Sequence, residues 1–80
     1  MLLKVKKPIF AESASFFVNK ASQYEGKVLI KKDHWVIDAK SLLGILALSL
    51  QPGQEIELDF EGEIDEIFVS EIVGAGLFER

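Results

Sequence analysis

The sequence predicts a two-layer α+β sandwich that forms one domain, residues 1–80, with one side of its sheet open to water. Strand-like and helix-like segments follow one another in the order β-α-β-β-α-β-α. Residues 55–61 alternate between acidic and apolar side chains, which is typical of a strand with one solvated face. Other segments carry apolar residues at helical spacing, so helices can cover the opposite face of the sheet.

The chain is predicted to begin with a strand and a helix. Residues 2–7 form a short strand that ends at Pro8, because proline cannot donate a hydrogen bond to a neighbouring strand. Residues 12–25 form a helix, since their apolar side chains recur three and four residues apart. Ser13 is a candidate cap for this helix, and Gly26 ends it.

The middle of the chain is predicted to hold a hairpin and a second helix. Residues 27–31 and 35–37 are rich in β-branched and aromatic side chains, and a short polar turn separates them. Residues 41–50 form the second helix, with Ser41 at its head and Gln-Pro-Gly at 51–53 ending it.

The chain is predicted to close with a strand and a third helix. The strand at 55–61 is followed by Gly62, and residues 64–78 then show apolar side chains on one helical face. Gly74 and Gly76 weaken the end of this last helix.

Composition excludes several classes of protein. The chain has no cysteine, so it has no disulfide, no thiolate nucleophile and no zinc site of the cysteine kind. A net charge of −4 argues against nucleic acid as a partner. No apolar run approaches the ~20 residues of a membrane span, and lysines interrupt the first segment, so we see no signal peptide. A cytoplasmic protein without membrane contact or cofactor is expected.

The second helix and the turns after it resemble the HPr family, the small phosphocarriers of the bacterial sugar phosphotransferase system. The likeness rests on Lys-Ser-Leu-Leu-Gly-Ile-Leu-Ala-Leu at 40–48, Gln-Pro-Gly at 51–53 and Glu-Gly-Glu at 61–63, and it extends over about residues 5–73. It implies an open-faced β-sandwich, a four-stranded antiparallel sheet with three helices on one face. The spacing is most similar to the form found in Gram-positive bacteria, where a dedicated kinase phosphorylates the serine that matches Ser41.

The same resemblance shows that the family's phosphate-carrying residues are replaced. The family uses a motif of the type Gly-Leu-His-Ala-Arg-Pro at the start of the first helix, and the matching stretch here is residues 8–13. Phe10 therefore stands at the histidine position and has no nucleophilic atom. Glu12 stands at the arginine position and would repel a phosphate. The resemblance thus implies a protein that cannot carry phosphohistidine, and we predict no catalytic residue.

Neither the single histidine nor the acidic strand offers a convincing active site. His34 falls in the predicted hairpin turn and is interpreted as a solvated residue, with too few neighbours to complete a metal site. The acids at 55, 57, 59 and 61 lie on an open sheet, where no cleft would hold a general acid–base pair. An enzyme is therefore the least favoured interpretation.

Ser41 has two interpretations that do not exclude each other. As a helix cap, its hydroxyl accepts a backbone N–H and stabilises the fold by roughly 1 kcal/mol. As a regulatory site, it would carry a phosphate at the positive end of the helix dipole, where the added charge would change an otherwise apolar surface.

Large apolar side chains gather at the positions that partners of the family recognise. The resemblance implies that the first-helix N-terminus and the start of the second helix lie side by side. We therefore predict a partner-binding surface there, made of Phe10, Phe16, Leu42, Leu43 and Leu46. The alternative is that Phe10 folds into the core and Leu42 and Leu43 are ordinary helix residues.

Two functions remain open at this point. The first is a non-catalytic HPr-like regulatory protein, related to the phosphotransferase system and controlled by phosphorylation of Ser41. Its partners would be a serine kinase, a transcriptional regulator or a second copy of the chain. The second is a small protein-interaction module on the same fold that has no remaining role in sugar transport.

Overall fold

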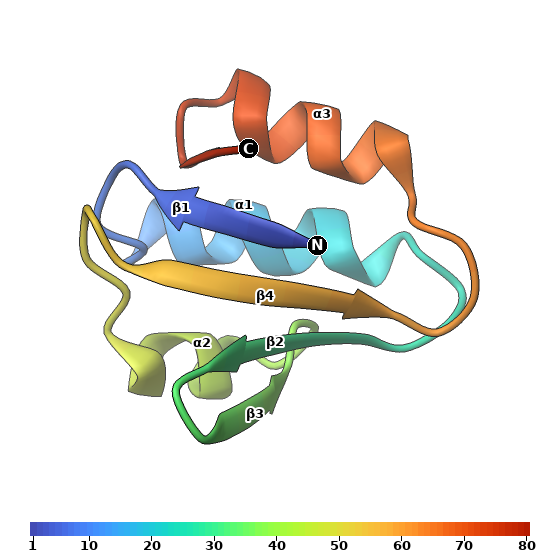
Figure 1. Ribbon diagram of the computed structural model, residues 1–80, viewed down its shortest axis with the longest axis horizontal. Coiled ribbons are helices and arrows are strands. Elements are labelled where there is room, and N and C mark those ends of the chain that lie inside the picture. The colour runs from blue at the N-terminus through green and yellow to red at the C-terminus, as the bar shows by residue number, and fades with distance from the viewer.

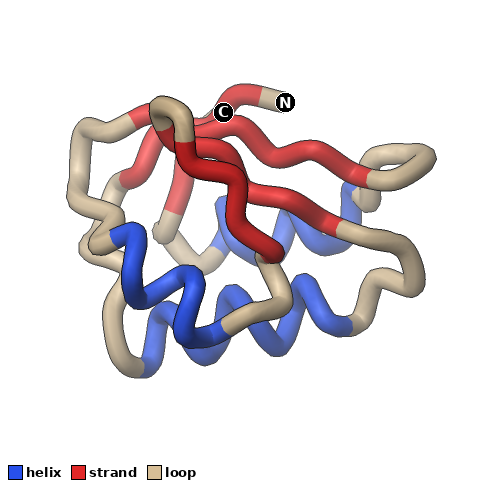
Figure 2. The backbone as a smooth tube through the Cα atoms, turned by 90° about the horizontal axis from the view of Figure 1, so that it is seen from below, coloured by secondary structure: helices blue, strands red, loops and turns tan.

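The computed structural model describes residues 1–80 and arranges them in two layers, a five-stranded antiparallel sheet and three helices. All three helices lie on one side of the sheet (Figure 2), as the sequence predicts. The elements are β1 (Leu2–Val5), α1 (Glu12–Ser22), β2 (Val28–Lys32), β3 (Trp35–Asp38), α2 (Leu42–Leu48), β4 (Glu55–Phe60), α3 (Glu66–Gly74) and β5 (Phe78–Glu79).

The strands are ordered β3-β2-β4-β1-β5 across the sheet, so β4 lies at its centre (Figure 1). Ile56, Leu58 and Phe60 are buried under the helices, while the acidic residues between them are exposed. This alternation confirms the predicted open face.

The fifth strand is the main departure from the predicted four. The last helix ends at Gly74, not at residue 78. It begins at Glu66 because Asp65 caps it, accepting hydrogen bonds from the N–H groups of Ile67 and Phe68. The chain then turns at Gly76, whose φ of +79° suits glycine. Phe78 pairs with Val5 of β1 and is buried, so tertiary packing overrides the helical periodicity of this segment.

The start of α1 also differs from the prediction. Ser13 does not cap the helix, because Ala11 occupies the cap position and makes no side-chain bond. The Ser13 hydroxyl instead accepts the N–H of Phe10 at 2.9 Å and donates to the carbonyl of Pro8 at 3.0 Å. It therefore braces the loop that precedes the helix.

The core contains apolar side chains alone, 20 residues in all, so no functional polar group is hidden inside the molecule. Its centre is an aromatic cluster in which Phe17 of α1 contacts two rings. The ring centroids are 5.5 Å from Phe68 of α3 and 5.6 Å from Phe78 of β5. Functional residues must accordingly be sought on the surface.

Candidate functional site

The loop before α1 presents a phenylalanine to solvent. Phe10 is 72% exposed, which excludes the alternative that it folds into the core. Its backbone is fixed by the bond to Ser13 and by the strained conformation of Ala11, whose φ is +52° and ψ −116°. Glu12 follows in the first turn of the helix. The loop thus presents an exposed phenyl ring two residues before an acidic one, and it holds no histidine.

Ser41 caps α2, as the sequence predicts. Its backbone is extended, with φ −97° and ψ 109°, and its Oγ accepts the N–H of Gly44 at 3.1 Å. Its carbonyl begins the helical ladder by accepting the N–H of Ile45 at 3.0 Å. Asp38 orders the preceding loop, because its carboxylate accepts the N–H of Lys40. The hydroxyl is therefore held at the surface, half-buried and already bonded.

The two helices run in opposite directions, which corrects the expected geometry of the site (Figure 1). The N–H of Ile9 donates to the carbonyl of Leu50, so Phe10 lies beside the end of α2. The ammonium of Lys40 donates to the carbonyl of Tyr24 at 2.6 Å, which places the start of α2 near the end of α1. Seven residues of helix, roughly 10 Å, separate the start of α2 from its end. The first-helix N-terminus and Ser41 are not side by side.

The predicted partner-binding residues divide into exposed and packed ones. Leu43 is 79% exposed and Leu42 is 40% exposed. Leu46 and Phe16 are partly buried and pack against the core, so neither is the freely exposed residue that we predicted. Leu46 follows Leu42 by one helical turn and lies on its flank of α2, and Phe16 lies below the Lys20 ammonium, 5.5 Å away. We call these three exposed residues, Phe10 beside the end of α2 and Leu42 and Leu43 at its start, the α1–α2 surface.

The remaining polar candidates lie on other parts of the molecule. His34 is in the β2–β3 turn, exposed, and stacks on Trp35 with ring centroids 5.8 Å apart. Asp59 on the open face pairs with Lys31 at 3.2 Å. No group of three or more potential metal-ligating side chains comes together.

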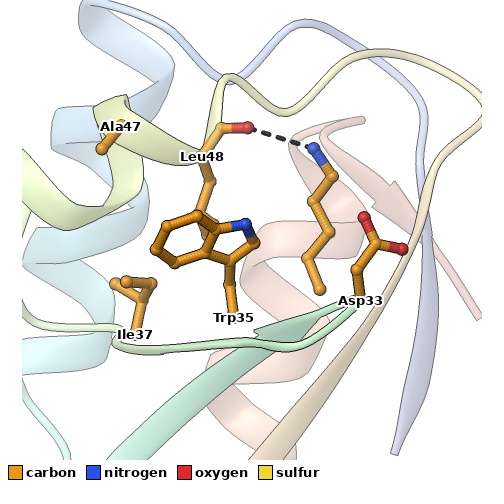
Figure 3. A pocket seen from close by; sticks show the side chains of 6 residues that line it. Asp33, Trp35, Ile37, Ala47 and Leu48 are labelled. Carbon is orange, nitrogen blue, oxygen red and sulfur yellow. Dashed lines mark hydrogen bonds between the residues drawn. The ribbon is translucent and has the colours of Figure 1, made fainter.

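The sequence interpretation missed one surface feature, at the outer strand β3. Trp35 and Val36 are more than half exposed. A small pocket of about 170 Å³ lies between β3 and α2, lined by Lys32, Asp33, Trp35, Ile37, Ala47 and Leu48 (Figure 3). The Lys32 ammonium closes one side by donating to the Leu48 carbonyl at 3.2 Å. The sequence did contain a signal for this feature, a tryptophan directly after the hairpin turn at the start of a short strand.

None of the helices combines the length and the apolar character needed to cross a bilayer.

Comparison with known proteins defines the class that this fold and surface represent. A family model described as the PTS HPr component phosphorylation site matches residues 3–75. The chain therefore belongs to the HPr family.

Its relatives include both carrier and HPr-like proteins. The chain is 32% identical over 71 residues to the phosphocarrier protein HPr of Borreliella burgdorferi, covering 89% of this chain and 83% of the relative. It is 31% identical over 64 residues to the HPr-like protein Crh of Halalkalibacterium halodurans, covering 80% and 76%. These relatives are named as phosphocarrier and HPr-like proteins, not as enzymes.

Solved structures agree with the family. The phosphocarrier protein HPr from Bacillus anthracis is 28% identical, with a TM-score of 0.79 over 96% of this chain and 93% of that one. Crh of Bacillus subtilis, described as an intertwined dimer with a swapped domain, is 27% identical, with a TM-score of 0.67 over 89% and 79%.

Proposed function

We propose that this HPr-family protein works in the cytoplasm by binding a protein partner and does not carry phosphate on a histidine. The observation that carries the proposal is the exposed Phe10 at the start of α1. The motif resemblance implies that the family's phosphate-accepting histidine corresponds to this position. A phenyl ring has no atom that can attack a phosphoryl group, but it gains free energy when a partner covers it.

The charge beside Phe10 supports the same interpretation. The helix N-terminus would favour an anion, but the Glu12 carboxylate in the first turn opposes one. The single histidine of the chain, His34, lies in the β2–β3 turn and not in this loop. The start of α1 therefore holds no histidine that could accept a phosphate.

Incubation with enzyme I and phosphoenolpyruvate tests the negative half of the proposal. The unaltered chain is expected to form no acid-labile phosphoprotein. Phe10→His alone should recover little labelling, because Glu12 still repels the phosphate. The double variant Phe10→His with Glu12→Arg should recover more. An acid-labile phosphoprotein formed by the unaltered chain would overturn this half.

Ser41 is the proposed control point. Its hydroxyl sits at the head of α2, directly before Leu42 and Leu43, so a phosphate there would add charge beside an apolar surface. We infer that a serine kinase modifies it, and that the modified surface is read by a regulator. The expected result with a kinase of HPr-type proteins is one phosphate per chain, which Ser41→Ala abolishes.

If the serine kinase does not phosphorylate the chain, the proposed regulation at Ser41 is wrong. Such a result, together with inactivity toward enzyme I, would favour the second candidate, an interaction module with no link to sugar transport.

The α1–α2 surface is the proposed contact with the partner. Phe10→Ser and Leu43→Lys should weaken partner binding without lowering the melting temperature, because neither side chain packs in the core. Co-sedimentation with the protein partner, together with thermal unfolding of both variants, checks this expectation. Variants that bind as the parent does but melt far lower would place these residues in the core and the partner site elsewhere.

A further inference from the structure

β3 is an edge strand with an uncovered side. It is the outermost strand of the sheet, and no other segment lies beyond it (Figure 1). Its first two residues are large and apolar, yet Trp35 is 57% exposed and Val36 is 56% exposed. Such an edge presents unpaired backbone groups to which another strand can bind.

The hairpin register identifies the backbone groups that are free. The N–H of Ala39 donates to the carbonyl of Val28, and hydrogen-bonded pairs alternate along an antiparallel ladder. Ile37 and Trp35 therefore bond to β2, whereas the N–H and carbonyl of Val36 point away from the sheet. The N–H of Asp38 points the same way, while its carbonyl already accepts the N–H of Ser41 at 2.9 Å.

β3 lacks lysine, proline and a bulge, three of the devices that keep natural edge strands from pairing with another chain. Its protection is limited to its short length and the charge of Asp38. The four residues of β3 are Trp, Val, Ile and Asp, and they pair with β2 in an unbroken register. The edge is therefore competent to accept a strand.

We propose that the β3 edge pairs, antiparallel, with the β3 edge of a second copy of this chain. The two-fold axis lies at Val36, whose free N–H and carbonyl bond reciprocally to those of its counterpart. Residues directly opposite each other then share a face of the sheet. Trp35 meets Ile37 on the helix-covered side, and the turn residue His34 comes opposite Asp38, at the end of the other copy's strand.

Charge and polarity select this register over its neighbour. An axis at Ile37 would also keep the faces matched, but it would set apolar Val36 against the Asp38 carboxylate. The axis at Val36 pairs apolar side chains with apolar ones. It also brings the exposed His34 turn of one copy close to Asp38 at the end of β3 of the other. The strand is thus complementary to itself.

The helix above β3 leaves room for the second copy. The flank of α2 over this strand is formed by Gly44 and Ala47, both small. A Cβ on Gly44 would lie only 2.5 Å from Cγ2 of Ile37, so α2 sits directly on the strand. Trp35 and Ile37 line the pocket beside Ala47 (Figure 3), so the apolar surface continues from the pocket to the edge.

A four-residue edge buries less than the roughly 1,200 Å² at which stable interfaces begin. The pairing is therefore expected to be weak and to depend on protein concentration. It is independent of the partner binding proposed above, since it uses a different surface.

Sedimentation equilibrium up to millimolar protein, together with amide NMR, tests the pairing. The amide signals of Val36 and Asp38 should shift with concentration. Val36→Lys places two like charges at the axis and should raise the dimer dissociation constant at least about tenfold. Leu43→Lys is the matched control, the same new charge on another exposed apolar residue, and should leave the constant unchanged.

Substitutions of His34, an exposed turn residue, test the register. His34→Lys should lower the dissociation constant several-fold, and His34→Asp should raise it by a similar factor. A chain that stays monomeric at millimolar concentration would refute the proposal. So would a dimer that survives Val36→Lys but is lost in Leu43→Lys, which would assign self-association to the α1–α2 surface.

Discussion

At the scale of single residues, Ser41 has a structural role as a helix cap whether or not it is phosphorylated. Its Oγ accepts the N–H of Gly44 at the first turn of a seven-residue helix, which has few other bonds to hold it. Losing that bond leaves a backbone donor without a partner.

Ser41→Ala is expected to lower the free energy of unfolding by roughly 1 kcal/mol. Ser41→Asp should restore most of it, because a carboxylate also caps a helix and suits its N-terminus. Urea denaturation of the two variants measures both effects. If the Asp variant is as unstable as the Ala variant, Ser41 does not cap the helix. The structural argument for phosphorylation at this position would then fail as well.

The sequence predicts the exposure of some site residues better than that of others. Leu43 lies nearly half a turn away from the buried Ile45 and Leu48 of α2, so periodicity alone indicates that it is exposed. Leu46 and Phe16 lie at the border of a helical face, where burial depends on the neighbouring element. Both pack against the core, which a single helix pattern cannot reveal.

At the scale of elements, the contact between α2 and β3 depends on a missing side chain. Gly44 faces Ile37 so closely that a Cβ would come within 2.5 Å of its Cγ2. A β-branched methyl cannot move aside by a simple rotation. The helix and the hairpin are therefore fitted to each other at this glycine.

Gly44→Ala is expected to lower the free energy of unfolding by about 1 kcal/mol, since overpacking costs ~1–3 kcal/mol and helix propensity returns about 1 kcal/mol. Gly74→Ala is the control at the end of α3, where a Cβ would meet nothing within 4 Å. It should raise the stability by roughly 0.5 kcal/mol. Chemical denaturation that shows the same sign for both variants would contradict this account.

Elements with local signals could be predicted from the sequence, and β5 could not. β4 is predicted by the strict alternation of its acidic and apolar residues. The order of the first seven elements follows from the periodicity of the apolar residues and from the turn residues between them. β5 has two residues, and nothing local distinguishes it from the end of a helix. Its pairing with β1 joins residues more than seventy positions apart, which no local pattern encodes.

At the scale of the whole molecule, one aromatic cluster ties together the early and late parts of the chain. Phe17 contacts both Phe68 and Phe78, so α1, α3 and β5 share a single packed centre. A domain of 80 residues has a modest reserve of stability.

Phe78→Ala is expected to cost about 3–5 kcal/mol, which would consume most of that reserve. Glu79→Ala, on the exposed neighbour in β5, should change the stability by less than roughly 0.5 kcal/mol. Calorimetric melting compares the two. Similar melting temperatures for both variants would show that β5 does not contribute to the packed core.

The two-residue β5 also limits how these molecules can join. It occupies the side of the sheet opposite β3, and it is too short to template the addition of a further strand. A sheet with two usable sides can grow without limit into a ribbon or fibril. Because only the β3 edge can accept a strand, edge-to-edge pairing should stop at the dimer. Concentrated solutions of the protein should therefore remain clear.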